Sequence, residues 1–218
     1  MNKRGCYIIF PEAHAIIAKN LCKEINDNYQ ISLNEKRMMW GAISPDILPK
    51  YKIYRHYKED SEAFLVNEIV NLIYICRFFN LKSLDNFKKK IISIKIGVIS
   101  HFLSDYVCLP HKENWTFNEA FKKHVNYEKE LNEVVKNHVF TKNVISTESI
   151  SLYECETIHL KKLVKEYINK VIDEYSLEQS YERDLDFALN LSTNISYFIF
   201  DVVNELSLET SMKYSFVF

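Results

Sequence analysis

Apolar side chains recur along the chain with the three-to-four-residue spacing of amphipathic helices. The pattern divides the chain into about six helical segments, near residues 12–29, 58–79, 84–108, 117–138, 151–175 and 178–206. An amphipathic helix must bury its apolar face against a neighbour, and short connections between helices favour a bundle. The pattern therefore predicts an all-α protein, a multi-helix bundle formed by a single domain that spans residues 1–218.

Few residues interrupt these segments. The 218 residues include only three glycines and four prolines, and the hairpin dipeptides Asn-Gly and Asp-Gly are absent. Asp85 stands where an N-cap residue would open the segment near 84–108, and Pro110 stops that segment just beyond its end. Gly97 lies one turn before His101, so a second helix could approach closely there. All four prolines lie within three residues of a histidine or aspartate that could bind a metal, which indicates rigid turns around one site.

Composition and charge exclude several classes of protein. A hydrophobic content of 47% supplies a full core, and a net charge of -1 gives no electrostatic reason to expect nucleic acid or an anionic membrane as a partner. Five cysteines without a C-x-x-C pair argue against a disulfide framework. No apolar run is long enough for a signal peptide, so the sequence as written predicts a cytoplasmic protein. A sequence that begins after a removed signal would look the same, and the protein would then be secreted.

Two pairs of metal-binding side chains fall within a 28-residue stretch. His101 and Asp105 form one pair, His124 and Glu128 form the other, and His111 lies between them. Residues four apart share a helix face, with Cβ atoms about 5–6 Å apart, so each pair could chelate one cation. Taken singly, either pair is more commonly a hydrogen-bonded His–carboxylate pair, but the repetition favours metal. Imidazole and carboxylate without thiolate suit catalytic zinc.

Three residues nearer the N-terminus extend this set. Asp46 ends a Ser-Pro-Asp motif, His56 follows it, and His14 lies at the start of the first segment. Each has an ordinary alternative: the motif could be only a helix N-terminus with an acidic residue in its first turn, and a lone histidine is often structural. His138 and His159 have no partner at ligand spacing and are interpreted as surface residues.

The order of these residues, H…SPD…H…HxxxDxxxxxH…HxxxE, resembles that of the bacterial zinc-dependent phospholipase C family. The matched positions are His14, Asp46, His56, His101, Asp105, His111, His124 and Glu128. They cover roughly the first 130 residues by motif, and the rest of the chain resembles the family only in its helical character. The resemblance implies an all-α bundle with a cluster of three zinc ions at one end.

The resemblance also implies how the ligands are shared. One zinc ion is held by Asp46, His56, His101 and Asp105, and a second by His111, His124 and Glu128. His14 and a bridging Asp105 contribute to a third, which the family completes with an N-terminal tryptophan. The present chain begins Met-Asn-Lys-Arg-Gly-Cys, without that tryptophan. Two zinc ions are expected, and the third is left open unless processing exposes a new amine or Cys6 replaces the tryptophan.

The activity implied by the resemblance is hydrolysis of a phosphodiester by zinc-activated water. Asp46 is the catalytic carboxylate that would accept the proton of this water. The expected substrate is a phospholipid, cleaved to diacylglycerol and a phosphorylated headgroup during transient contact with a membrane surface. No β-rich membrane-binding module is recognisable after the helical region, so membrane lysis is not expected.

The choice of headgroup is left open. Choline-binding members of the family carry an aromatic residue directly after the Ser-Pro-Asp aspartate and another just before the next histidine. Ile47 follows the aspartate in the present chain, and Ile53 precedes His56 by three residues. Tyr51 and Tyr54, with the adjacent Tyr57, could form a replacement cation–π wall, although packing is the simpler interpretation.

Two other functions remain open at this point. Zinc-dependent single-strand nucleases share the HxxxDxxxxxH element, but their last pair resembles HxxxD, whereas His124 is followed by Glu128. Those nucleases are also disulfide-bonded secreted proteins, so nucleic acid is not the expected substrate. The other alternative is a helical protein that binds metal without catalysis. The sequence indicates no oligomeric state.

Overall fold

The computed structural model describes residues 11–115, 119–150 and 159–215. Within these ranges the chain forms eight α-helices and no strand, so the all-α prediction is confirmed. The helices are α1 (Glu12–Tyr29), α2 (Glu35–Ile47), α3 (Lys58–Cys76), α4 (Asn86–Tyr106), α5 (Leu109–Lys112), α6 (Glu119–Val134), α7 (Leu160–Tyr175) and α8 (Tyr181–Ser215). Two short 3-10 turns, η1 (Pro49–Tyr51) and η2 (Leu81–Ser83), lie in the connections.

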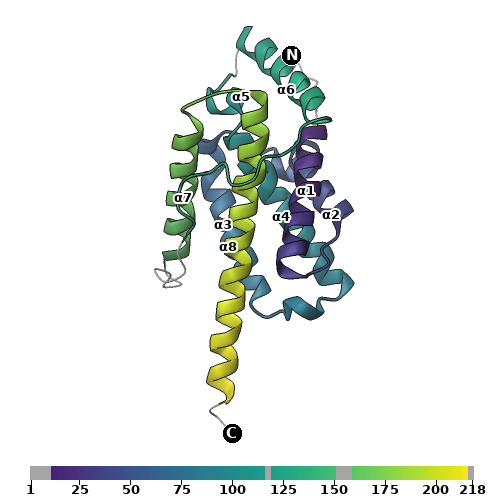
Figure 1. Cartoon of the computed structure of the whole chain (residues 1–218), viewed down its shortest axis with the longest axis vertical. Helices are drawn as coiled ribbons and strands as arrows, with labels where there is room; N and C mark the ends of the chain where they lie inside the picture. Colours follow the sequence, from purple (N-terminus) through teal and green to yellow (C-terminus); the bar gives the residue numbers. More distant parts are fainter. Residues whose placement is uncertain (1–10, 116–118, 151–158, 216–218) are drawn as a thin grey trace.

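Helix α4 is the centre of the bundle. It contacts α1, α2, α3, α5 and α8, and its side chains from Ile96 to Tyr106 are all buried. Helices α5 and α6 lie at one end of the molecule together with the first turns of α1 and α8 (Figure 1). The last turns of α8 project beyond the other helices at the opposite end (Figure 1). The C-terminal end of α4 therefore points into the end of the bundle where α1, α5 and α6 meet.

Most of the predicted segments correspond to helices. The segment predicted near 12–29 matches α1, and those near 58–79, 117–138 and 178–206 match α3, α6 and α8 within a few residues except at the C-terminal end of α8. Asp85 caps α4 as predicted, because its side chain accepts a 2.8 Å hydrogen bond from the Lys88 amide. The predicted segment 151–175 includes α7, while residues 151–158 lie outside the described part. Pro110 does not simply follow α4, because it lies in the first turn of the short helix α5.

The hydrophobic pattern missed helix α2, and the interpretation of Ser-Pro-Asp as a possible helix N-terminus was wrong. Pro45 lies inside α2 and Asp46 in its last turn. A proline inside a helix leaves one carbonyl without its amide partner. The Ser44 hydroxyl replaces that partner by donating a 2.9 Å hydrogen bond to the Gly41 carbonyl. The serine therefore lets the helix continue through the proline and carry Asp46 beyond it.

Two glycines let α2 and α4 approach each other closely. A Cβ added at Gly97 would lie 2.2 Å from the Met38 carbonyl oxygen, and one added at Gly41 would lie 2.3 Å from the Ile94 carbonyl oxygen. Both distances are well inside van der Waals contact, so only glycine fits at either position. The close approach expected at Gly97 is confirmed, and it fixes the distance between the helix that carries Asp46 and α4.

The cysteines that can be placed behave as small apolar residues. Cys22, Cys76 and Cys108 are buried and form no disulfide, whereas Cys6 and Cys155 lie outside the described residues. The described helices include none with both the length and the hydropathy needed to cross a membrane.

Candidate metal centre

The centre is built on the last two turns of α4. His101 and Asp105 lie one turn apart there and are 0% and 2% exposed. The His101 Nδ1 atom lies 2.7 Å from the Ala42 carbonyl oxygen, a contact that the close approach of α2 makes possible. A histidine held through one ring nitrogen presents its other ring nitrogen to a metal ion in a fixed direction. His101 Nε2 points at Asp105 Oδ2, 3.2 Å away.

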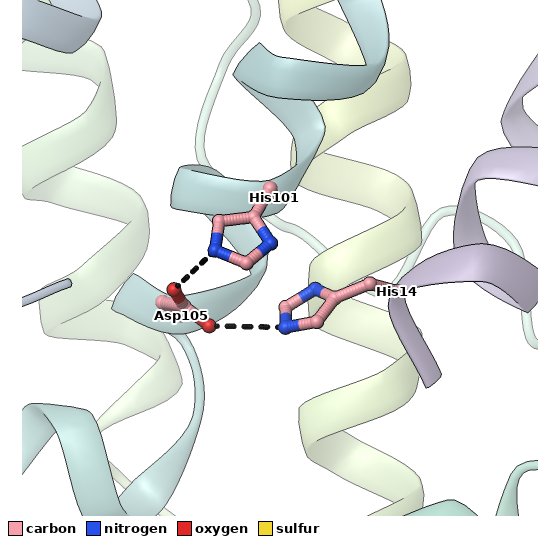
Figure 2. A group of neighbouring side chains, drawn as sticks. All are labelled: His14, His101 and Asp105. Atoms are coloured by element: carbon pink, nitrogen blue, oxygen red, sulfur yellow. Dashed lines mark ion pairs between the residues drawn. The ribbon is translucent and has the colours of Figure 1, made fainter. Parts of the chain in front are cut away.

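Helix α1 places a second histidine against the same carboxylate. His14 lies in the first turn of α1, and its Nε2 atom is 3.3 Å from Asp105 Oδ1. Figure 2 shows His14 and His101 approaching the two oxygens of Asp105 from different helices. The two rings lie 4.2 Å apart, centroid to centroid. Asp105 therefore has a histidine nitrogen next to each oxygen, so each oxygen could bind a metal ion together with a histidine.

The segment from the end of α2 to the start of α3 contributes Asp46 and His56. His56 Nδ1 lies 3.1 Å from Asp105 Oδ2, 3.5 Å from Asp46 Oδ1 and 3.3 Å from His101 Nε2. Asp46 Oδ1 also lies 3.7 Å from His101 Nε2. These four side chains come from three separate parts of the sequence, and their nitrogen and oxygen atoms converge on one small volume.

Helices α5 and α6 form a second group next to the first. Glu128 Oε1 lies 2.8 Å from His124 Nε2 and 3.2 Å from His111 Nε2. The His124 Nδ1 atom is 3.2 Å from the Trp115 carbonyl oxygen, so its Nε2 atom also has a fixed direction. His111 Nε2 lies 3.7 Å from Asp105 Oδ1, which joins this group to the first.

Asn132 links the helices that carry His14 and Glu128. It lies one turn after Glu128 in α6, is 4% exposed, and its amide donates a 2.7 Å hydrogen bond to the Glu128 carbonyl. Its side-chain oxygen accepts a 2.7 Å hydrogen bond from the Ala13 amide in the first turn of α1. Pro11 provides no side-chain cap for α1. Asn132 therefore caps α1 from another helix, directly beside His14.

Two carboxylates of the centre, Asp105 and Glu128, are held as anions by the surrounding histidines. Burial alone would raise the pKa of Asp105, but the histidines His101, His111 and His14 outweigh it and hold that pKa well below its usual value. Burial also opposes ionisation of Glu128, yet hydrogen bonds from His111 and His124 lower its pKa to about 2. Anionic carboxylates surrounded by imidazoles are a ligand set for a divalent cation.

The arrangement of the nitrogen and oxygen atoms suits a zinc ion. Asp105 Oδ2 is buried and makes no hydrogen bond of acceptable geometry, although two histidine nitrogens lie within 3.2 Å of it. Three overlapping groups each bring three ligand atoms within 4.8 Å of one another: His14, His101 and Asp105; Asp46, His56 and His101; and His111, His124 and Glu128. Imidazole nitrogens and carboxylate oxygens that converge on one small volume are typical of a zinc site.

Comparison with known proteins places the chain in a family. A family model described as zinc dependent phospholipase C matches residues 13–182 of the 218. The chain belongs to this family. The resemblance drawn from eight ligand-type residues is confirmed. No curated protein and no solved structure matches the chain.

The zinc-dependent phospholipase C family accounts for the histidine and carboxylate pattern, and the bundle gathers all eight predicted residues at one end. Sequence reasoning missed the residues that orient them. Asn132 had a signal in the sequence, since it lies four residues after Glu128 and therefore on the same helix face. The carbonyls of Ala42 and Trp115 have no signal in the sequence, because any residue carries one.

Two histidines were placed outside the centre. The interpretation of His138 as a surface residue was wrong, because its side chain is 8% exposed and its Nε2 atom lies 2.7 Å from Asp186 Oδ1 on α8. His159 is exposed, as predicted. Neither belongs to the three groups of ligand atoms found among the described residues.

The tyrosines near His56 pack as the simpler interpretation expected. Tyr54 stacks on Phe64 with ring centroids 4.0 Å apart, and Tyr51 meets Phe64 edge to face. Tyr57 lies against the ring of His111, with centroids 5.7 Å apart. Cys6, named as a replacement ligand, lies outside the described residues.

Zinc binding to the metal-free protein is expected to release protons at pH 7. Burial opposes protonation of His14, but the charge of Asp105 outweighs it and raises the pKa of His14 to about 9. His14 is therefore protonated at pH 7, and a nitrogen that binds zinc must lose that proton. The apparent zinc affinity should rise with pH up to about 9.

Titration calorimetry in two buffers with different ionisation enthalpies measures the number of protons released. The His14→Gln protein is the control, because it lacks this proton and should release fewer on binding zinc. Equal proton release by the two proteins would show that His14 is not a ligand.

Proposed function

We propose that this protein is a zinc-dependent phospholipase C that cleaves phospholipid to diacylglycerol and a phosphorylated headgroup. The observation that carries the proposal is the convergence of eight ligand-type side chains, Asp105 and Glu128 among them, at one end of the bundle in a chain of this family. In this proposal Asp46, His56, His101 and Asp105 hold one zinc ion. A second is held by His111, His124 and Glu128. His14 and Asp105 supply two ligands of a third site, which requires others to be complete.

Bound zinc would lower the pKa of a water molecule to about 7 and neutralise charge on the phosphoryl oxygens. The protein's own groups position and deprotonate this water. Burial raises the pKa of Asp46 above its usual value in the metal-free protein. Its carboxylate lies 3.5 Å from His56 Nδ1 and 3.7 Å from His101 Nε2, where it could accept the proton of this water. As the water oxygen bonds to phosphorus, Asp46 would take its proton. The bond between phosphorus and the glycerol oxygen would break, and that oxygen would take up a proton to give the diacylglycerol hydroxyl.

Exposed apolar side chains beside the ligands favour a lipid substrate. Ile47 follows Asp46 directly and is 39% exposed, and Ile53 in the connection to His56 is 75% exposed. Phe121, one turn before His124, is 44% exposed. Large apolar groups exposed next to a polar centre commonly mark a surface that meets lipid or protein. Lys50 and Lys52, in the same connection as Ile53, are exposed and could contact phosphate groups of a bilayer.

The test combines zinc analysis with two substrates. We expect the zinc-loaded protein to hydrolyse phospholipid in vesicles, measured as released diacylglycerol, and to leave single-stranded DNA intact. The Asp46→Asn protein should keep the zinc of the His111, His124 and Glu128 group but lose at least about 100-fold in rate, because the proton acceptor is gone. Metal removal by a chelator should abolish the activity of the wild-type protein and any residual activity of the Asp46→Asn protein.

Cleavage of DNA without cleavage of lipid would support a nuclease instead. A protein that binds zinc but turns over neither substrate would support the non-catalytic alternative. Full activity of the Asp46→Asn protein would remove Asp46 from the catalytic role.

A further inference from the structure

A buried carboxylate contacts the residues that adjoin two members of the group formed by His111, His124 and Glu128. Asp184 is in the first turn of α8, is 2% exposed, and lies just beyond residue 182, where the family match ends. Its Oδ2 atom accepts a 2.8 Å hydrogen bond from the Tyr127 hydroxyl and a 3.2 Å hydrogen bond from the Leu109 amide. Its Oδ1 atom accepts a 2.5 Å hydrogen bond from the Tyr175 hydroxyl. Three different helices therefore donate to this one side chain.

Two of these donors adjoin proposed zinc ligands. Leu109 opens α5 and lies two residues before His111, and Tyr127 directly precedes Glu128 in α6. Because both donate to the same oxygen, that atom sets the distance between the start of α5 and this turn of α6. His111 and Glu128 face each other across the same gap, with Nε2 and Oε1 atoms 3.2 Å apart. Tyr175 of α7 holds the other oxygen and so fixes the rotation of the carboxylate.

Packing alone is a poor reason for a carboxylate at this place. No lysine, arginine or histidine forms an ion pair with Asp184 among the residues for which ion pairs are described. A buried carboxylate without a counter-charge is stabilised only by its hydrogen bonds, and an apolar side chain would avoid the cost of burying it. Burial accordingly raises the pKa of Asp184 to about 6. What an apolar side chain could not do is accept hydrogen bonds from α5 and α6 together.

We propose that Asp184 is a positioning residue that holds His111 and Glu128 at the separation required by their zinc ion. It does not touch the metal, and it acts through Leu109 and Tyr127. The inference rests on the proposed zinc site, since it concerns the affinity of the group formed by His111, His124 and Glu128. Outer residues that orient metal ligands typically change metal affinity about 10–100-fold when they are replaced.

The test measures zinc affinity in the full chain by competition with a chromogenic chelator. We expect Asp184→Ala to lower the affinity for one zinc ion about 10–100-fold and to leave the affinity for any other zinc ion unchanged. The His124→Ala protein, in which the same group lacks a ligand, identifies the affected ion. Asp184→Asn should recover most of the affinity, because its amide oxygen can still accept from Leu109 and Tyr127 while its NH₂ group donates to the Tyr175 oxygen.

Asp186→Ala is the matched control. Asp186 lies on the same turn of α8 and also accepts two hydrogen bonds, from His138 and the Thr141 amide, but neither partner adjoins a ligand. The Asp186→Ala substitution should lower the free energy of unfolding without changing zinc affinity. Equal zinc loss in the Asp184→Ala and Asp186→Ala proteins would overturn the inference, because it would reduce Asp184 to a general structural role.

A milder variant covers the case in which Asp184→Ala does not fold. Tyr127→Phe removes a single hydroxyl and keeps the ring, so we expect the fold to be retained. The affinity for the same zinc ion should fall several-fold. Unchanged zinc affinity in this variant would overturn the inference while leaving the proposed function intact. A wild-type protein that binds no zinc would overturn both.

Discussion

The Asp105→Asn protein is expected to lose both its zinc and its activity. Asp105 lies within 3.7 Å of four histidine nitrogens, from His14, His56, His101 and His111, and it is the carboxylate that joins the two groups of ligands. Asparagine keeps the size of the side chain but removes the charge that a bridging ligand supplies to two cations. The loss of zinc affinity should exceed the about 10–100-fold effect of removing an outer partner, because a ligand itself is lost.

Zinc content per chain after dialysis and the rate of phospholipid cleavage together check this prediction. Asp85→Asn is the control on the same helix. Its position is exposed, and asparagine is as good an N-cap as aspartate, so stability, zinc content and activity should all stay at the wild-type level. Retention of full zinc content by the Asp105→Asn protein would contradict the site described above.

The Gly97→Ala protein is expected to be destabilised by about 3 kcal/mol, which corresponds to a fall in Tm of about 6–12 °C for a chain of this size. The added Cβ would lie 2.2 Å from the Met38 carbonyl oxygen and 2.8 Å from the Ala42 amide nitrogen, so α2 must move away from α4. The neighbours are backbone atoms, which cannot turn aside as a flexible side chain could. Movement of α2 would also pull the Ala42 carbonyl away from His101 and weaken zinc binding.

Thermal melts in the presence of a chelator measure the stability effect separately from the loss of zinc. Replacing a helical glycine with alanine ordinarily stabilises a protein by about 0.4–1 kcal/mol, so the expected sign is opposite to the usual one. Lys90→Ala, at an exposed position of the same helix, should change stability by less than about 0.5 kcal/mol. A Gly97→Ala protein as stable as the wild type would show that the two helices can separate at no cost.

The sequence indicated most of the candidate ligands because their signal is local. His101 with Asp105, and His124 with Glu128, are each four residues apart, so one helix brings each pair together. The position of Asp46 was harder to predict, because the hydrophobic pattern of residues 35–47 is interrupted by a glycine and a proline. Continuation of α2 depends on a hydrogen bond from Ser44 to Gly41, which replaces the bond that proline cannot make.

Contacts between distant segments were beyond the reach of sequence patterns. His138 looked unpartnered because its carboxylate, Asp186, lies 48 residues away and meets it only after α8 has packed against the connection that follows α6. The hydrogen bonds of Asp184 belong to the same class, since their donors come from α5, α6 and α7. Local spacing can indicate which residues bind a metal, but the residues that hold those ligands in place are set by tertiary packing.

The cap that Asn132 provides for α1 bears on when the centre can form during synthesis. The hydrogen bond from Ala13 to Asn132 joins residues 119 positions apart, so the start of α1 remains uncapped until most of α6 has been made. His14 is therefore the first candidate ligand to be synthesised, yet the cap beside it forms only after the last candidate ligand, Glu128, has been made. A chain that ends before Asn132 carries the His–carboxylate pairs without this cap, so the final orientation of His14 requires at least the first 132 residues.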